Sequence, residues 1–227
     1  MKVLVIDVGG THLKLLSTGR KIPRKIDSGP EMSAGQMVAA VLNATKDWSI
    51  EAISLGYPGP VLHGRPVSEP HNLGPGWVGM DYSKALGHPV KIINDAAMQA
   101  LGAYKGGRML FLGLGTGLGS AMIVDGRLEP MELAHLHYKR GTYEDYLGVG
   151  GLKRRGKKKW RRDVLEVALQ FKAALGAEEI VLGGGNAKKL ARLPEGMRVG
   201  GNADAFAGGF SLWNANAQGR PGPKRKR

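Results

Sequence analysis

Cysteine is absent from the 227-residue sequence. This absence excludes disulfides, thiolate zinc sites and cysteine nucleophiles, and it agrees with a reducing compartment. Long apolar runs are absent as well. The N-terminal run reaches Asp7 after four apolar residues, too short for a signal segment, and nowhere do about 18 apolar residues follow one another. We therefore expect a soluble, cytoplasmic protein that binds no membrane and forms one large domain or two smaller lobes.

Acidic residues are also few, with 19 Asp and Glu against 33 Lys and Arg, which gives a net charge of +14. The excess lies in residues 151–227, which hold 18 of the cations and 6 of the anions, and it ends in a small basic cluster at 220–227. The positive electrostatic field of such a region attracts polyanions in general, although a solvated helix face would have the same composition. The densest part consists of Lys153, Arg154, Arg155, Lys157, Lys158, Lys159, Arg161 and Arg162.

Strand and helix patterns alternate along the chain, which predicts an α/β fold. Each of two strand pairs is joined by a glycine–threonine turn, at 9–11 and at 115–117, and this internal repeat indicates two related lobes that face one another. We predict strands at 2–8, 13–17, 52–55, 90–94, 109–115 and 179–185, and a further strand within 121–128 that is closed by an Asp-Gly turn. We predict helices at 37–48, 96–104, 157–175 and 203–213, with another that starts near Asn186.

The repeat also predicts the division of the chain into domains. We place an N-terminal lobe at 1–96 and a C-terminal lobe at 97–202, and we expect the helix at 203–213 to pack back on the first lobe. The remaining residues, 214–227, are basic and contain two prolines, so we expect a disordered tail.

Two common nucleotide-binding motifs are missing. The sequence contains no GxxxxGK[ST], and the strand at 109–115 leads into another strand where a dinucleotide fold requires a helix. Three glycine-rich strand ends remain, at 9–10, 113–119 and 183–185. Any one of them could be an ordinary tight turn. Glycines also let backbone N–H groups approach phosphate oxygens, and the repeated context favours phosphate binding.

Asp95 is the sharpest candidate for a catalytic residue, because it follows the strand at 90–94 and begins a helix. Ligands bind at such strand ends in open α/β sheets, and phosphoryl transfer to a hydroxyl needs a carboxylate to take the proton. Asp95 could equally be a helix cap, and the two roles are compatible. Asn94 could hold a sugar hydroxyl, while Asp7 could orient a metal-bound water or accept from backbone donors.

A third polar group follows the second strand pair. Glu132 and His135 are three residues apart and could bind vicinal hydroxyls, and Glu144 is the next acidic residue. A zinc site is the alternative, since His135 and His137 would share one face of a strand, but no third ligand is evident. The Pro- and Gly-rich stretch 63–77 is a long loop of the kind that often carries function.

Taken together, the ordered motifs resemble the ROK family of sugar kinases, and more narrowly its bacterial polyphosphate glucokinase branch. The resemblance spans residues 2–213 and depends on the segments IDVGGTHLK, SLGYPGP, NLGPGW, INDAAMQALG, LGLGTGLGSAMIVDG, ELAH and VLGGGNAKKL. It implies a two-lobed actin/hexokinase-like (ribonuclease H-like) fold with an interlobe cleft. It also implies a hexose substrate, a polyphosphate or ATP donor, and Mg²⁺ bound with that donor. We expect a homodimer, although the sequence itself leaves the number of subunits open.

The resemblance assigns roles position by position. Asp95 would be the general base for transfer to the 6-hydroxyl of a hexose. The sugar contacts would be Asn94, Glu132, His135 and Glu144. The phosphate contacts would be Asp7, Gly9, Gly10, Thr11, Lys14, Gly115, Thr116 and Gly117. Gly183, Gly184 and Gly185 would lie near a nucleoside, if the donor is a nucleotide. The run from Lys153 to Arg162 bears on the donor through its charge: beside the cleft it would hold polyphosphate as a track, and a solvated helix face is the alternative.

Three departures from the family pattern matter. Many members carry a Cys-rich zinc loop, which this chain cannot form, so no structural zinc is expected. Ala134 stands where a glycine is common, and Ala97 where an acidic residue is often seen.

Some ROK relatives are sugar-responsive repressors, and a non-catalytic sugar sensor or nucleic-acid-binding relative is the alternative function. We do not expect nucleic-acid binding, because those repressors have a helix-turn-helix before the first strand and the basic run here has no paired recognition helix. The sequence leaves open the choice of glucose or mannose and the choice of donor.

Overall fold

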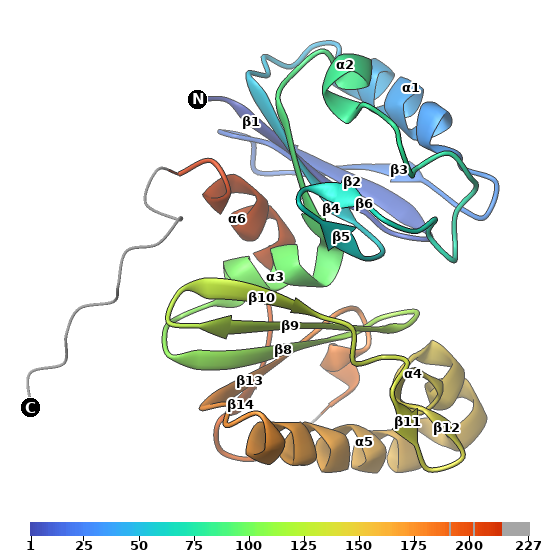
Figure 1. Ribbon diagram of the computed structural model, residues 1–227, viewed down its shortest axis with the longest axis vertical. Coiled ribbons are helices and arrows are strands. Elements are labelled where there is room, and N and C mark those ends of the chain that lie inside the picture. Colours follow the sequence, from blue (N-terminus) through green and yellow to red (C-terminus); the bar gives the residue numbers. More distant parts are fainter. Residues whose placement is uncertain (191, 202, 215–227) are drawn as a thin grey trace, which may run out of the picture.

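The computed structural model describes residues 1–190, 192–201 and 203–214 (Figure 1). It contains two five-stranded sheets, with strand orders β3-β2-β1-β4-β7 and β10-β9-β8-β13-β14. The predicted α/β class is therefore confirmed. The cluster at 220–227 and nearly all of the predicted tail lie outside the described residues. The first sheet is built from β1 (Val3–Val8), β2 (His12–Ser17), β3 (Arg24–Asp27), β4 (Ala52–Tyr57) and β7 (Val90–Asn94). The second is built from β8 (Arg108–Leu114), β9 (Leu118–Val124), β10 (Arg127–Met131), β13 (Glu179–Gly183) and β14 (Met197–Val199).

The two sheets share one topology, which confirms the internal repeat. In each sheet three strands pair antiparallel as consecutive hairpins, and two further strands then add in parallel. β1 is buried at all six positions, as expected for a central strand that is covered on both faces. Because the folds of the sheets correspond, the glycine–threonine turns after β1 and β8 occupy equivalent places.

Helices cover the outer faces of the sheets and fill the space between them (Figure 1). α1 packs on the first sheet through Met37, Val38 and Val41, and α5 packs on the second through Val164 and Val167. The helices are α1 (Ala34–Thr45), α2 (Tyr82–Leu86), α3 (Asp95–Ala103), α4 (Tyr143–Leu147), α5 (Val149–Ala174) and α6 (Asp204–Ser211).

α3 and α6 cross between the two sheets at very close range. A Cβ atom on Gly102 would overlap the backbone of α6, and one on Gly208 would overlap the backbone of α3. α6 also reaches the first sheet, where the Ser54 hydroxyl donates to the Gly209 carbonyl at 2.6 Å. Small residues therefore hold the helix that joins the two sheets against the last helix of the described chain.

The structure corrects one predicted element and adds several. The helix expected to start near Asn186 is wrong: only a single 3₁₀ turn, η1 (Ala187–Lys189), forms there. Asn186 is tied to β8 and the turn after it, since its N–H donates to Leu114 O and its side chain to Gly115 O. The unpredicted short elements are β3, β10, β14, α2, α4 and two small hairpins, β5 (Val61–Leu62) with β6 (Arg65–Pro66) and β11 (His137–Tyr138) with β12 (Gly141–Thr142).

The basic helix begins earlier than the sequence predicts. α5 starts at Val149, but Gly156 has φ 74° and ψ 157°, which are not helical angles. The predicted start at Lys157 therefore coincides with the second of two helical segments, 149–155 and 157–174.

Candidate active site

Asp95 is the first residue of α3, at the carboxyl end of β7. Asn94 caps this helix, because its Oδ1 accepts a hydrogen bond from the Ala97 N–H at 3.0 Å, and its Nδ2 donates to Gly59 O at 3.1 Å. Asp95 instead accepts from the neighbouring Ala96 N–H at 2.8 Å. The interpretation of Asp95 as the helix cap is therefore wrong. Asn94 fills that position, and Asp95 keeps one carboxylate oxygen that the helix start does not engage.

The surroundings of Asp95 make its ionised form costly. Burial raises the pKa of Asp95 to about 7, with further contributions in the same direction from the negative charges of Asp7 and Glu132. The N–H of Ala96 lowers this pKa by a smaller amount. Asp7 comes from the first lobe and Glu132 from the second, so carboxylates from both sheets converge here. A carboxyl group with a pKa near neutrality can accept a proton at the pH of the cell and release it again.

The first glycine–threonine turn lies at the end of β1. Asp7 is buried there, and its Oδ2 accepts from Lys14 Nζ at 3.0 Å. The turn closes through the Gly9 N–H, which donates to His12 O at 3.1 Å. Thr11 is exposed beside it. A Cβ on Gly10 would lie 3.0 Å from Cβ of Asn72, so this glycine permits the long loop of the first lobe to approach the turn.

The second turn, Gly115–Gly117, lies between β8 and β9 and is held from the side by α4 and α5. Glu144 accepts the N–H of Leu118 at 3.0 Å, and the carbonyl of Thr116 accepts the N–H of Val149 at 3.1 Å. A Cβ on Gly119 would lie 2.6 Å from Cβ of Ala96, so the β8–β9 hairpin packs directly on the N-terminal end of α3. The second turn is therefore fixed beside the helix that begins with Asp95.

Three polar residues that follow β10, namely Glu132, His135 and Glu144, lie between Asp95 and the second glycine turn. Glu132 is largely exposed, yet the protein atoms around it raise its pKa through desolvation; His135 opposes this and Glu144 adds to it. The backbone N–H of Glu144 donates to Ala134 O at 3.0 Å, which ties α4 to the segment that carries His135. Glu132, His135 and Glu144 therefore form one cluster. His135 does not belong to a strand, so the expected shared strand face of His135 and His137 is wrong.

The long loop of the first lobe contributes residues whose role the sequence pattern does not indicate. The rings of His71 and His135 meet edge to face, with centroids 6.3 Å apart, so the two lobes touch at this point. Asn72 lies against Gly10 and is exposed. Buried Trp77 anchors the loop by donating from Nε1 to Gly74 O at 2.7 Å. The motif NLGPGW marked this loop as functional, but nothing in its spacing indicated which polar side chain faces the first turn.

The third glycine-rich end lies beside the second turn, because β13 pairs in parallel with β8. Gly183 stands opposite Gly113, and Gly184 has a φ of 79° and packs on the backbone of Leu114. The adjacent Asn186 donates to Gly115 O at 3.2 Å. Gly185 is exposed. The three glycine-rich ends thus form two groups, one after β1 and the other shared by β8 and β13.

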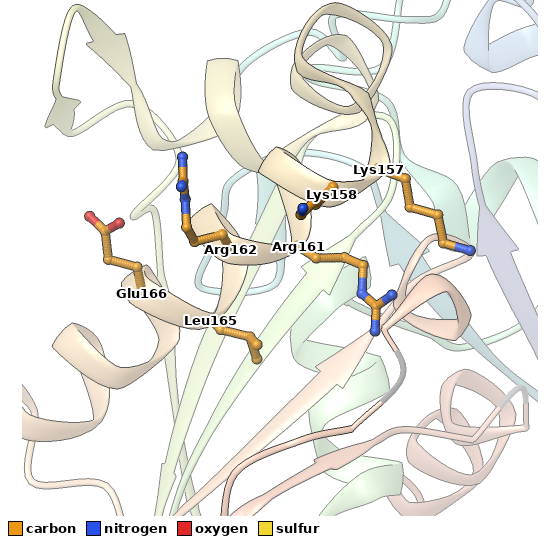
Figure 2. Close-up of a pocket in the computed structure, with 6 residues that line it drawn as sticks. All are labelled: Lys157, Lys158, Arg161, Arg162, Leu165 and Glu166. Atoms are coloured by element: carbon orange, nitrogen blue, oxygen red, sulfur yellow. The ribbon is translucent and has the colours of Figure 1, made fainter.

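Gly156 divides the basic run into a part before it, Lys153 to Arg155, and a part after it, Lys157 to Arg162. Arg155 donates to the fully buried Asp163 at 2.6 Å, and Arg154 donates to the carbonyl of Asp145, so both are occupied within the protein. Beyond Gly156, a groove of about 710 Å³ follows the helix (Figure 2). Its lining residues are Lys157, Lys158, Arg161, Arg162, Leu165 and Glu166.

Metal binding has limited support from the side chains. Among the described residues, no group of three or more His, Asp and Glu side chains is placed to hold a metal ion by itself. Lys14 contacts only Oδ2 of Asp7, so Oδ1 remains as an oxygen of the kind that Mg²⁺ takes together with donor phosphates. Of the helices that the structure describes, none combines the length and the apolar character needed to cross a bilayer.

Two sheets of the same order, with glycine turns and a carboxylate where they meet, define a two-lobed α/β fold of the actin/hexokinase class. Solved structures agree. The inorganic polyphosphate/ATP-glucomannokinase from Arthrobacter sp. strain KM has a TM-score of 0.75 and 24% identity, with 91% of this chain and 96% of that chain covered. A ROK family glucokinase from Streptomyces griseus, solved with glucose and AMPPNP, has a TM-score of 0.74 and 18% identity, with 93% and 99% covered.

Sequence comparison leads to the same group. Polyphosphate glucokinase of Mycobacterium tuberculosis (strain H37Rv) is 29% identical over 209 residues, covering 81% of this chain and 77% of that protein. The Mycobacterium leprae polyphosphate glucokinase is 27% identical over 212 residues, covering 82% and 64%. No protein-family model matches the chain. The resemblance that the motifs indicate is confirmed: in sequence the chain is similar to polyphosphate glucokinases, and in fold it is similar to ROK family sugar kinases.

Proposed function

We propose that this protein is a sugar kinase that moves a phosphoryl group from polyphosphate or ATP to the 6-hydroxyl of a hexose, glucose first. The observation that carries the proposal is the position of Asp95, with a pKa raised to about 7, beside Asp7 of the first turn and the hairpin of the second. The names of the relatives support it, since they include polyphosphate glucokinases and a polyphosphate/ATP-glucomannokinase. We place the reaction where the two lobes meet.

In this mechanism the carboxylate of Asp95 takes the proton of the sugar hydroxyl as its oxygen forms a bond to the terminal phosphorus. The bond from that phosphorus to the leaving phosphate breaks, and the shortened donor departs with its electron pair. Backbone N–H groups of the turns at Gly9–Thr11 and Gly115–Gly117 would hold the donor oxygens, with the hydroxyls of Thr11 and Thr116. Lys14 would offset negative charge next to Asp7. Mg²⁺ bound with the donor would neutralise phosphate charge, with Asp7 as its protein ligand.

The sugar would lie among Asn94, Glu132, His135 and Glu144, and Asn72 is a further candidate contact. Asn94 has one amide N–H left after its bonds to Gly59 and Ala97, so its contribution is a single donated hydrogen bond. Glu144 already accepts from Leu118 through Oε2 and offers Oε1. Mannose is the natural second substrate, because one epimeric hydroxyl gives modest discrimination unless it leaves a buried partner unpaired.

The test is a coupled assay of glucose phosphorylation with ATP and with polyphosphate, on the native protein and on Asp95→Asn. We expect the variant to lose turnover with both donors and to keep its affinity for glucose. Asp125→Asn is the matched control, since Asp125 lies in an exposed turn between β9 and β10 at φ 49°, a conformation that Asn also adopts. The kinase proposal is rejected if the native protein phosphorylates no hexose with either donor.

A non-catalytic sugar sensor is the second candidate function. A ROK family transcriptional regulator, a homologue of the E. coli MLC protein, has a TM-score of 0.68 to this chain, with 17% identity. This candidate predicts glucose binding without turnover in the native protein, so the same assay, combined with calorimetric titration of glucose, separates the two functions.

A further inference from the structure

The break in α5 lies in the middle of the basic run. Gly156 adopts φ 74° and ψ 157°, a region of backbone space that essentially only glycine can occupy. The break therefore starts a new helical segment at Lys157. Its first three residues are Lys157, Lys158 and Lys159, followed by the buried Trp160.

Three lysines at a helix start oppose the helix dipole. The N-terminus of a helix carries partial positive charge, which favours acidic residues and anions and disfavours cations. No acidic residue occurs among residues 157–162, so nothing within this turn offsets the repulsion. The arrangement costs stability in the free protein, and a bound anion would relieve that cost.

The two arginines just before the break differ from the groove residues in what they contact, since Arg154 donates to the Asp145 carbonyl. Arg155, before the break, is paired with Asp163. Within the described residues, no ion pair or hydrogen bond to a carboxylate is formed by Lys157, Lys158, Arg161 or Arg162. Glu166, at the end of the groove, is paired with Lys139. Figure 2 shows the four cationic side chains projecting from adjacent turns of one helix, with Lys157 at one end and Glu166 at the other.

The groove is connected to the proposed phosphate site by the helix itself. The N–H of Val149, the first residue of α5, donates to Thr116 O in the second glycine turn. The groove residues follow 8 to 13 positions later, in the second segment beyond the break at Gly156. One stretch of chain therefore carries both the contact to the turn and the groove. A long linear anion is the kind of ligand that would engage both.

We propose that Lys157, Lys158, Arg161 and Arg162 form an anchor groove for the distal part of a linear inorganic polyphosphate whose terminal phosphate lies at the glycine turns. The inference rests on the proposed function, and it narrows the basic run from eight residues to four. Each contact is a weak, salt-screened attraction, so affinity comes from their number. Donor affinity should then increase with chain length and decrease with salt, while the rate at saturation is set at Asp95.

The first experiment compares two variants that each lose four positive charges. The groove variant carries Lys157→Gln, Lys158→Gln, Arg161→Gln and Arg162→Gln. The control carries Gln at four exposed lysines outside α5, namely Lys21, Lys25, Lys46 and Lys105. The substrates are glucose with ATP, with tripolyphosphate and with long-chain polyphosphate. Glutamine is a good helix former, so both variants should fold, and ATP-dependent activity verifies that they do.

We expect the groove variant to raise KM for long-chain polyphosphate by about tenfold or more, with kcat unchanged, because it removes four weak contacts. KM for ATP and tripolyphosphate should stay within about twofold in both variants, as should KM for long-chain polyphosphate in the control. The proposal is overturned if both variants change KM for long-chain polyphosphate equally, or if native KM is no lower for long-chain polyphosphate than for tripolyphosphate.

A binding measurement separates this inference from the proposed function. Long-chain polyphosphate is titrated into Asp95→Asn with and without the groove substitutions, at several salt concentrations. We expect the groove substitutions to weaken binding and to flatten its dependence on salt. Binding that depends on the groove, without sugar phosphorylation by the native protein, would support the groove and reject the kinase. Phosphorylation with ATP alone, without polyphosphate binding, would support the kinase and reject the groove. Equal competition by single-stranded DNA would show a general nucleic-acid surface and overturn the assignment to polyphosphate.

Discussion

The two sheets use their crossover helices differently. Between its third and fourth strands in chain order, the first sheet has α1 and the second has α5, so the helices occupy corresponding places. α1 has 12 residues, none of them charged, and begins with a capping box at Ser33. α5 has 26 residues with nine Lys or Arg, two acidic residues and no side-chain cap at Gly148. Because α1 covers its sheet without any charged residue, the place of this helix in the fold does not by itself account for the number of cations in α5.

The largest contrast between the lobes is catalytic. α3 follows β7 as α6 follows β14, and each helix begins with an aspartate, Asp95 and Asp204. We expect Asp95→Asn to lower kcat about 10²–10⁴-fold, because a general base contributes about that much. Asp204→Asn should leave kcat nearly unchanged, since Asp204 accepts the Gly201 N–H, a bond that the amide oxygen can retain. Equal losses in steady-state assays of the two variants would refute the assignment of the base to the first lobe.

The second contrast concerns what holds each crossover helix. Asp163 is fully buried in α5 between Arg155 and Lys139, whereas α1 has no buried charge. Asp163→Asn should lower the free energy of unfolding by about 2–4 kcal/mol, because it leaves two cations without their buried partner. Urea denaturation measures the loss. Arg155→Met combined with Asp163→Asn should recover part of it, and a full additive loss would argue against coupling through this pair.

The pH dependence sharpens the role of Asp95 in the first lobe. The pKa of Asp95 is raised from 3.8 to about 7 in the folded protein, so the folded state binds the proton of Asp95 more tightly than the unfolded state does. The contribution of Asp95 to the free energy of unfolding is therefore highest below about pH 4, and this contribution is lost as the pH rises through 7. At pH 8, Asp95→Asn should therefore stabilise the protein by about 1–3 kcal/mol, and at pH 4 by almost nothing. Thermal unfolding of both proteins at the two pH values measures this difference. In parallel, native kcat/KM should fall below pH 7 as the base becomes protonated. A variant equally stabilised at both pH values would show that the effect is not electrostatic.

The smallest contrast is between two glycines. Gly102→Ala should destabilise the protein by about 1–3 kcal/mol, because the new Cβ would overlap the backbone of α6. Gly35→Ala, in α1, meets nothing within 4 Å and should stabilise by about 0.5–1 kcal/mol through helix propensity. Differential scanning calorimetry of the two variants decides the matter. If both substitutions shifted Tm in the same direction, the close crossing of α3 and α6 would be in doubt.

The sequence was sufficient for the strands of both sheets that carry strong apolar patterns and for the glycine turns that repeat between them. It failed where structure depends on distant partners. β14 has only three residues and pairs through β13, and β11 and β12 have two residues each. The start of a helix at Asn186 was predicted from local glycines, whereas the observed turn is set by bonds to Leu114 and Gly115, about seventy residues earlier.

The candidate site shows the same limit. A strand end followed by a helix start was enough to select Asn94 and Asp95, but not to decide which of them caps the helix. The contact of Asn72 with Gly10 joins two segments about sixty residues apart, and no periodicity encodes it. Likewise, the basic run was visible as composition, while its division at Gly156 depends on one backbone conformation and on the burial of Asp163.

The crossing of α3 and α6 also sets an order for folding during synthesis. Val5 of β1 lies directly beneath Gly209 of α6, and Ser54 of β4 donates to the Gly209 carbonyl. Part of one face of the first sheet, the part that α3 does not cover, thus stays exposed until residues some two hundred positions later leave the ribosome. The first lobe to be made is the last to be completed, so its exposed valines are the surface that a chaperone would meet on the growing chain.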